Sequence, residues 1–118
     1  MRVFKTASFA RVAQRARISD TELCEAARET AAGQAVDLGG GVFKKRLNRN
    51  QHRGIILARG GRLWFYVYLF AKKDQASISP PELAAFRLLA KSYEALSAKH
   101  LADILTARDL KEICRDSA

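Results

Sequence analysis

The sequence contains few residues of the kinds that cross-link small proteins or hold metal ions. Its 118 residues include two cysteines and two histidines. Cys24 and Cys114 stand in no metal-ligand or redox spacing, so we predict free thiols in a reducing compartment. His52, His100 and the scattered acids form no metal-binding motif. We therefore expect neither a metal ion nor another cofactor.

Long apolar runs are also missing. The longest run covers residues 63–71, whereas a membrane-spanning helix needs about 20 apolar residues. The first ten residues contain no apolar run of the kind found in secretory signals. We find no repeat and no low-complexity linker. The sequence therefore predicts one cytoplasmic domain over residues 1–118, large enough to bury a core without disulfides.

Acidic residues are absent from residues 42–73, although the chain as a whole has 12 of them and a net charge of +9. The same stretch contains nine basic residues: Lys44, Lys45, Arg46, Arg49, Arg53, Arg59, Arg62, Lys72 and Lys73. A cluster of one charge sign repels itself, which disfavours a merely solvated surface. Nucleic acid is the first candidate for a compensating partner, and an anionic membrane is the second.

Apolar periodicity predicts the elements of secondary structure. A short strand at 2–5 comes before a helical hairpin at 6–32, in which Ser19 and Glu22 have the spacing of a capping box. The period then changes from 3.6 to 2 after the glycines at 39–41. Three strands follow, at 42–49, 53–59 and 62–70, and Gly60-Gly61 is a strong hairpin signal between the last two.

Helices are expected in the remaining third of the chain. Ser79, followed by two prolines and Glu82, has the pattern of a capped helix start. Further short helices are expected at 98–107 and 109–115. The whole pattern predicts an α+β fold, with an N-terminal helical hairpin packed on a small antiparallel sheet and C-terminal helices after it. The core would cover about 1–95, and a C-terminal helical extension about 97–115.

Strand alternation predicts which side chains face outward. Phe43 and Leu47 should enter the core, which leaves Lys44 and Arg46 on the opposite face. In the last strand, one amphipathic face would carry Arg62, Trp64, Tyr66, Tyr68 and Phe70. Its tyrosines could stack on bases, or they could pack in the core, and the pattern leaves both open. Trp64 and Phe70 are expected to pack under a C-terminal helix.

The order and spacing of several short motifs resemble the RelE family of toxin–antitoxin toxins, and most closely its HigB-like branch. The matching residues are Phe4-Lys5-Thr6, Phe9-Ala10, Ile18-Ser19-Asp20, Leu23-Cys24-Glu25-Ala26, Leu38-Gly39-Gly40-Gly41, Lys44 with Arg46, Arg53, Phe70-Ala71-Lys72 and Glu82-Leu83. The resemblance implies a RelE-like fold and a metal-independent endoribonuclease that cuts messenger RNA on the ribosome. It also implies a cognate antitoxin, of helix-turn-helix type in this branch, and a toxin–antitoxin complex that can bind operator DNA.

The resemblance also implies the site. By position, Lys44, Arg46, Arg53 and Lys72 match the family's catalytic cations. His52 stands where family members usually have an aromatic residue, and Lys73 stands where many have arginine or serine. The identity of the proton donor therefore stays open. Further RNA contacts are expected from Lys45, Arg49, His52, Tyr66, Tyr68 and Lys73.

Cleavage of RNA without a metal needs a base for the 2′-hydroxyl, cations on the phosphate and an acid for the leaving 5′-oxygen. Neighbouring positive charges favour the neutral form of a lysine, so Lys44 is the candidate base. Arg46 and Arg53 could hold the phosphate bidentately. Lys72 or His52 could be the acid, although His52 could equally be a polar turn residue. Arg59 and Arg62 could form a solvated hairpin or contact the ribosome.

Two other functions fit the same fold class. A ParE-like toxin would inhibit DNA gyrase through protein contacts and would not need the four cations. A non-catalytic RNA- or DNA-binding module would bind nucleic acid without cutting it. Cleavage of a translated message separates the three possibilities.

Overall fold

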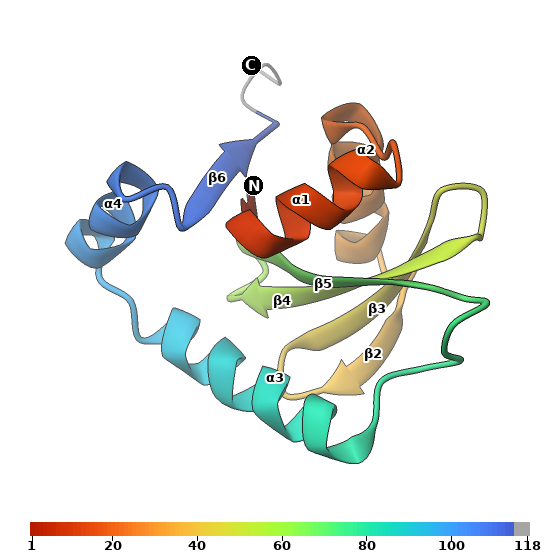
Figure 1. Ribbon diagram of the computed structural model, residues 1–118. Helices are drawn as coiled ribbons and strands as arrows, with labels where there is room; N and C mark the ends of the chain where they lie inside the picture. The colour runs from red at the N-terminus through yellow and green to blue at the C-terminus, as the bar shows by residue number, and fades with distance from the viewer. Residues whose placement is uncertain (115–118) are drawn as a thin grey trace.

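A sheet with helices on both faces is the main feature of the computed structural model, which describes residues 1–114 (Figure 1). The elements in chain order are β1 (Arg2–Thr6), α1 (Ala7–Arg15), α2 (Asp20–Ala31), β2 (Val36–Gly39), β3 (Val42–Leu47), β4 (His52–Arg59), β5 (Leu63–Ala71), α3 (Pro80–Glu94), α4 (Ala98–Thr106) and β6 (Leu110–Ile113). The expected α+β class and the opening strand are confirmed.

The described strands form one sheet in the order β2-β3-β4-β5-β1-β6. Strand β1 pairs with β5 in parallel, and every other neighbouring pair is antiparallel. The predicted meander is β3-β4-β5, and the glycines at 60 and 61 lie in the turn between its last two strands. Strand β2 was missed, because the sequence around it contains glycines that we interpreted only as a break.

The C-terminal helix predicted at 109–115 is wrong. Residues 110–113 form strand β6, which pairs with β1; Arg115 lies outside the described residues. Leu110 and Ile113 are three residues apart, a spacing that also fits one face of a helix. In the strand they lie on opposite faces, and each is buried in a different hydrophobic cluster. The helix predicted at 98–107 is present as α4.

The two faces of the sheet are covered by different helices. Helix α1 packs on β5 and β1, and α2 packs on β3. Helix α3 packs on β4 and β3 from the other side, where apolar residues of α4 join the same core. Helices α1 and α2 lie within the hairpin predicted at 6–32, but an arrangement with the helical hairpin first is not confirmed, because β1 precedes both helices.

Helix starts follow the predicted capping residues, with one difference. Ser79 and Glu82 form the full capping box of α3. Ser19 caps α2 by accepting a hydrogen bond from the backbone of Glu22. The carboxylate of Glu22 instead accepts a hydrogen bond from the backbone N–H of Asn48, 2.5 Å away in the β3–β4 loop. This side chain therefore ties the loop to the helix.

A β-bulge in β5 decides which aromatic residues enter which core. Ile55 pairs with Tyr68 but Ile56 pairs with Tyr66, so Val67 is an extra residue in β5. Tyr66 consequently lies on the face covered by α1 and α2, and Tyr68 on the face covered by α3. The single amphipathic face predicted for this strand is wrong for this reason.

Trp64 stays on the Tyr66 side of the bulge, where it packs against Phe43 rather than under a C-terminal helix. Phe70 lies on the opposite face in the cluster that includes apolar residues of α3, as expected. The alternation predicted for Phe43 and Leu47 is confirmed, because both pack in the cluster under α1 and α2.

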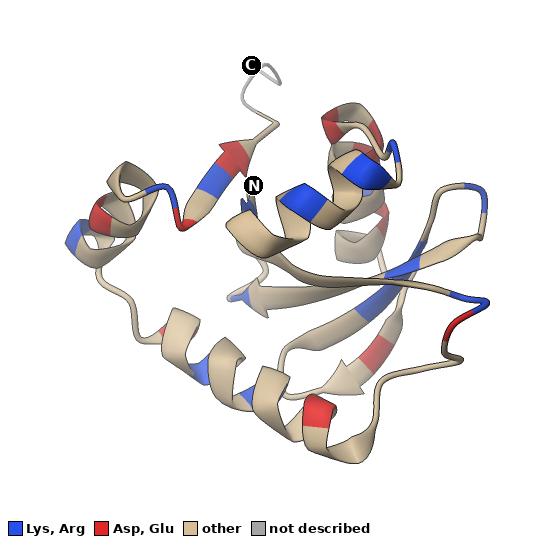
Figure 2. Ribbon diagram, in the orientation of Figure 1, with Lys and Arg blue, Asp and Glu red and all other residues tan. Residues whose placement is uncertain are grey.

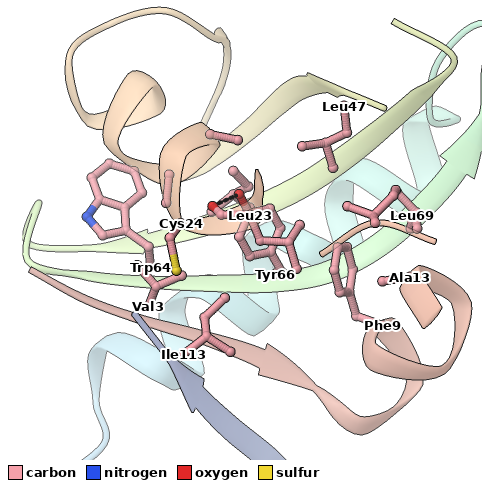
Figure 3. Packing of buried hydrophobic residues seen from close by; sticks show 14 residues of the cluster. Val3, Phe9, Ala13, Leu23, Cys24, Leu47, Trp64, Tyr66, Leu69 and Ile113 are labelled. Carbon is pink, nitrogen blue, oxygen red and sulfur yellow. Dashed lines mark hydrogen bonds between the residues drawn. The ribbon is translucent and has the colours of Figure 1, made fainter. Parts of the chain in front are cut away.

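Tyr66 is the centre of the core under α1 and α2 (Figure 3). Its side chain is fully buried, its ring lies 4.9 Å from that of Phe9, and its hydroxyl donates a hydrogen bond of 2.7 Å to the carbonyl oxygen of Leu23. Burial raises the pKa of Tyr66 far above its ordinary value. The phenol therefore remains a protonated donor that links β5 to α2.

The prediction of free thiols is wrong. Cys24 in α2 and Cys114, the residue after β6, form a disulfide with their Cα atoms 5.6 Å apart. The two positions are 90 residues apart in the sequence. No local spacing could reveal the pair, because β6 comes close to α2 only once it has joined the sheet beside β1.

We expect Tyr66→Phe to lower the free energy of unfolding by about 1 kcal/mol, because a buried hydrogen bond is lost without a change of shape. Urea denaturation under a fixed thiol state measures the effect. Tyr93→Phe is the matched control, since that hydroxyl forms no hydrogen bond with the described residues. Equal losses in the two variants would contradict the role given to the Tyr66 hydroxyl.

Candidate functional site

Three of the predicted cations lie on one face of the sheet, at the end where the β3–β4 loop projects. Arg46 in β3 pairs directly with Arg53 in β4. Directly opposite residues on antiparallel strands have Cβ atoms about 5 Å apart and point to the same face. Lys44 lies two residues before Arg46 on the same strand and therefore on the same face. Side chains from two neighbouring strands thus lie on one face.

Hydrogen bonds hold two of these side chains in place. The ammonium group of Lys44 donates to the Ser77 hydroxyl at 3.2 Å. The guanidinium of Arg53 donates to the carbonyl oxygens of Asn50 and His52, each at 3.0 Å. Arg46 is exposed. Within residues 1–114, none of these three cations forms an ion pair with a carboxylate. Their charge is therefore available to an anionic ligand.

Tyr68 lies on the same face as the three cations, because the β-bulge places it opposite Ile55. Its ring lies 5.6 Å from Phe70 and 5.8 Å from Phe86, and its hydroxyl donates to Gln75 at 3.2 Å. Partial burial, with a smaller contribution from the negative charge of Glu82, raises the pKa of Tyr68. The side chain is therefore a neutral, partly exposed ring beside the cations.

A surface hollow of about 610 Å³ lies at the same end of the sheet, and its lining includes His52, Lys72 and Lys73. The backbone N–H of Lys72 donates to the carbonyl oxygen of Gln51 at 2.9 Å, which joins the two loops around the hollow. His52 is half-buried, with Nδ1 3.1 Å from the side-chain amide nitrogen of Asn48. Lys72 and Lys73 are exposed.

Two of the residues predicted to contact RNA are held elsewhere. Lys45 points to the face covered by α2, where its ammonium lies 3.0 Å from the Glu29 carboxylate and donates to the carbonyl oxygen of Gln34. The Lys45 side chain is 11% exposed, and Tyr66 lies in the core. Arg49, by contrast, is exposed in the β3–β4 loop.

The β3–β4 loop has an unusual backbone. Asn48, Arg49 and Asn50 have positive φ angles of 53°, 53° and 70°. Asparagine visits this region more readily than most residues, whereas arginine does so at a cost of about 1–2 kcal/mol. The Glu22 carboxylate and the hydrogen bond from Gln51 to Asn48 fix this conformation. The Asn-Arg-Asn triplet was a usable sequence signal for the loop, but its anchor Glu22 had no signal beyond its place in an apparent capping box.

Basic and acidic residues lie in different parts of the structure (Figure 2). Basic residues mark β3, the β3–β4 loop and the start of the segment after β5, while α2 carries several of the acids. Ser77 and Gln75, which contact Lys44 and Tyr68, come from that segment and were not predicted. They are short polar residues in a loop, and nothing in their spacing indicated contact with the strands.

Two features are absent from the described residues. Residues 1–114 contain no grouping of three or more histidine, cysteine or acidic side chains suited to a metal ion. None of the described helices combines the length and apolarity needed to cross a bilayer.

We expect Glu22→Ala to loosen the β3–β4 loop, because the Asn48 amide would lose a charged acceptor. A hydrogen bond to a charged group contributes about 1.5–3 kcal/mol, so the amide of Asn48 should exchange with solvent at least roughly tenfold faster. Amide exchange followed by NMR measures this. Glu25→Ala, at an exposed position of the same helix, is the control. Unchanged protection at Asn48 would show that the carboxylate does not anchor the loop.

Comparison with known proteins identifies a family. The family model described as the RelE toxin of the RelE/RelB toxin–antitoxin system matches residues 1–113. Searches of curated proteins and of solved structures give no significant match. Because the family match extends over almost all of the 118 residues, this chain belongs to the RelE toxin family.

Proposed function

We propose that this chain is the toxin of a toxin–antitoxin pair and that it blocks translation by cutting messenger RNA on the ribosome. The observation that carries the proposal is the convergence of Lys44, Arg46 and Arg53 on one face, without carboxylate partners among the described residues. In a member of the RelE family, such a cluster suits the phosphate of a message.

In the proposed reaction, the 2′-hydroxyl of the message attacks the adjacent phosphate and the 5′-oxygen leaves. Arg46 and Arg53 would hold the phosphate oxygens and stabilise the charge that grows in the transition state. Lys44 would accept the proton of the 2′-hydroxyl. Lys72, which lines the hollow at this end of the sheet, is the candidate acid. His52 pairs with Leu47, so its side chain points to the face under α1 and α2, away from Arg46 and Arg53.

Binding would extend beyond the reacting phosphate. Tyr68 offers a partly exposed ring beside the cations, on which a base can stack. Arg49 and Lys73 are exposed at the edge of the same area and would contact neighbouring phosphates. The proposal leaves out Lys45, which pairs with Glu29, and Tyr66, which is fully buried.

The ribosome and an antitoxin are the proposed partners. A cationic site without a strong acid–base pair needs help in orienting its substrate, and a ribosome that holds the message supplies that orientation. The proposed place of action is therefore the cytoplasm. An antitoxin must silence the toxin in a growing cell, and in the HigB-like branch we expect a helix-turn-helix antitoxin whose complex with the toxin binds operator DNA.

Arg53→Ala should reduce cleavage of a translated message by roughly a hundredfold or more, as expected when one preorganised charge donor is removed. Purified chain is added to an in vitro translation reaction, and message ends are mapped over time. Arg59→Ala, at the far end of the same strand, is the charge-matched control and should stay near the activity of the unchanged chain. Equal cleavage by the two folded variants would refute the proposed site.

The same assay, run beside a DNA gyrase supercoiling assay, tests the function itself. Cleavage that requires ribosomes supports the proposal. Blocked gyrase with intact messages would instead indicate a ParE-like toxin. RNA or DNA binding with no cleavage and no block of translation would indicate a binding module.

Affinity for single-stranded RNA should depend steeply on salt. If four to six cations contact phosphates, the logarithm of affinity should fall with the logarithm of salt concentration by about 0.7 per contact, a slope of roughly −3 to −4. Fluorescence anisotropy with a labelled oligonucleotide measures it. A slope near zero would contradict the electrostatic part of the proposal.

A further inference from the structure

The disulfide between Cys24 and Cys114 lies at a surface hollow rather than deep in the core. Cys24 is 7% exposed and Cys114 is half-buried. Both line a hollow of about 400 Å³, together with Arg28 and residues near the start of α2 and the end of β6. Cys114 is thus the more exposed of the two cysteines, and both border a hollow that a small thiol compound could enter.

The bond adds a covalent link to a short strand at the edge of the sheet. Strand β6 has four residues and lies at the edge of the sheet, where it pairs with β1. The disulfide adds a covalent link from the end of this strand to α2, on the face where Ile113 is buried. Loss of the bond would leave β6 held by its ladder with β1, by the ion pair of Glu112 with Arg2 at 2.8 Å, by the burial of Leu110 and Ile113, and by its contacts with α4.

Whether Cys24 and Cys114 form a disulfide depends on the redox state of their surroundings. The proposed function places the chain in the cytoplasm, where the glutathione and thioredoxin systems keep most thiols reduced. A pair whose geometry already suits a disulfide forms one there when the oxidant concentration rises. The cytoplasmic location rests on the proposed function, whereas the thiol chemistry of the two cysteines does not.

We propose that Cys24 and Cys114 form a reversible thiol–disulfide site that exchanges with a low-molecular-weight disulfide such as glutathione disulfide. The thiolate of Cys114 attacks the small disulfide and releases one small thiolate, which leaves a mixed disulfide on Cys114. The thiolate of Cys24 then attacks the Cys114 sulfur and releases the second small thiol. Two protein thiols become one disulfide, and the oxidant takes up both electrons and both protons as two thiols.

Arg28 gives the hollow a suitable contact for that class of compound. Glutathione carries two carboxylates and one ammonium group, and the exposed Arg28 guanidinium can pair with a carboxylate. The two acids of the same hollow, Asp20 and Glu112, already form ion pairs with Lys5 and Arg2. Oxidation therefore links β6 covalently to α2, and reduction allows the strand to open locally more often.

The test uses the full chain equilibrated with mixtures of reduced and oxidised glutathione. Acid quenching, alkylation with N-ethylmaleimide and mass spectrometry count the free thiols in each mixture. We expect two labelled thiols in reducing mixtures and none in oxidising ones, with the change reversed on adding reduced glutathione. Amide exchange in a peptide covering 109–114 should be at least roughly tenfold faster in the reduced chain, while a peptide from β4 stays unchanged.

Two variants provide the controls. Cys114→Ser removes the half-buried partner, so its amide exchange at 109–113 should equal that of the reduced chain in every mixture. Cys24→Ser should retain glutathione on Cys114 as a stable mixed disulfide, because no second thiol resolves it. Arg28→Gln should slow formation of the disulfide by glutathione but leave oxidation by diamide, which carries no carboxylate, at its original rate.

Three outcomes would overturn the proposal. Two free thiols in every mixture would exclude the bond, and a bond that survives the most reducing mixture would be a permanent cross-link. Equal amide exchange at 109–113 in the oxidised and the reduced chain would show that the disulfide does not hold β6 in place. None of these readouts involves RNA, so a failure here is distinct from a failure of the proposed cleavage activity.

Discussion

The register shift between β4 and β5 determines which tyrosine faces each side of the sheet. Because Val67 is an extra residue, Tyr66 enters the core under α1 and α2, while Tyr68 lies beside the cations of β3 and β4. A β-strand without the bulge would place both tyrosines on one face. The core would then lose its buried phenol, or the cationic face would lose its aromatic neighbour. One inserted residue thus separates a structural tyrosine from a candidate binding one.

The covering of both faces of the sheet explains why the candidate site lies at one end. Helices α1 and α2 cover one face, and α3 covers much of the other. Lys44, Arg46 and Arg53 remain accessible because they lie near the β3–β4 loop, at the end of the strands. Crowded like charges destabilise a fold unless a ligand compensates them. The two cores supply the stability that lets the chain keep this cluster.

Local signals were sufficient for much of this fold, and they failed where a contact was non-local. The caps at Ser19 and Ser79, the Gly60-Gly61 turn and the alternation around Lys44 were predictable because each depends on a few adjacent residues. Strand β6 and the Cys24–Cys114 bond were not, because each depends on a partner far along the chain. The bulge at Val67 was missed for a different reason, because a one-residue shift inside a hairpin leaves no mark in an apolar run that alternates regularly. Of the candidate site, the strand cations could be predicted, whereas the roles of Glu22, Gln75 and Ser77 required the assembled loops.

Strand β1 has a further consequence for how cooperatively the chain folds. Val3 pairs with Trp64 on one side and with Ile113 on the other, so both of its neighbours come from distant parts of the sequence. Val3 is buried in one core and Phe4 in the other. The entropy of closing these long loops is offset only when both cores assemble around β1. The meander β3-β4-β5 can form from neighbouring segments, but the two cores become a single cooperative unit only through this first strand.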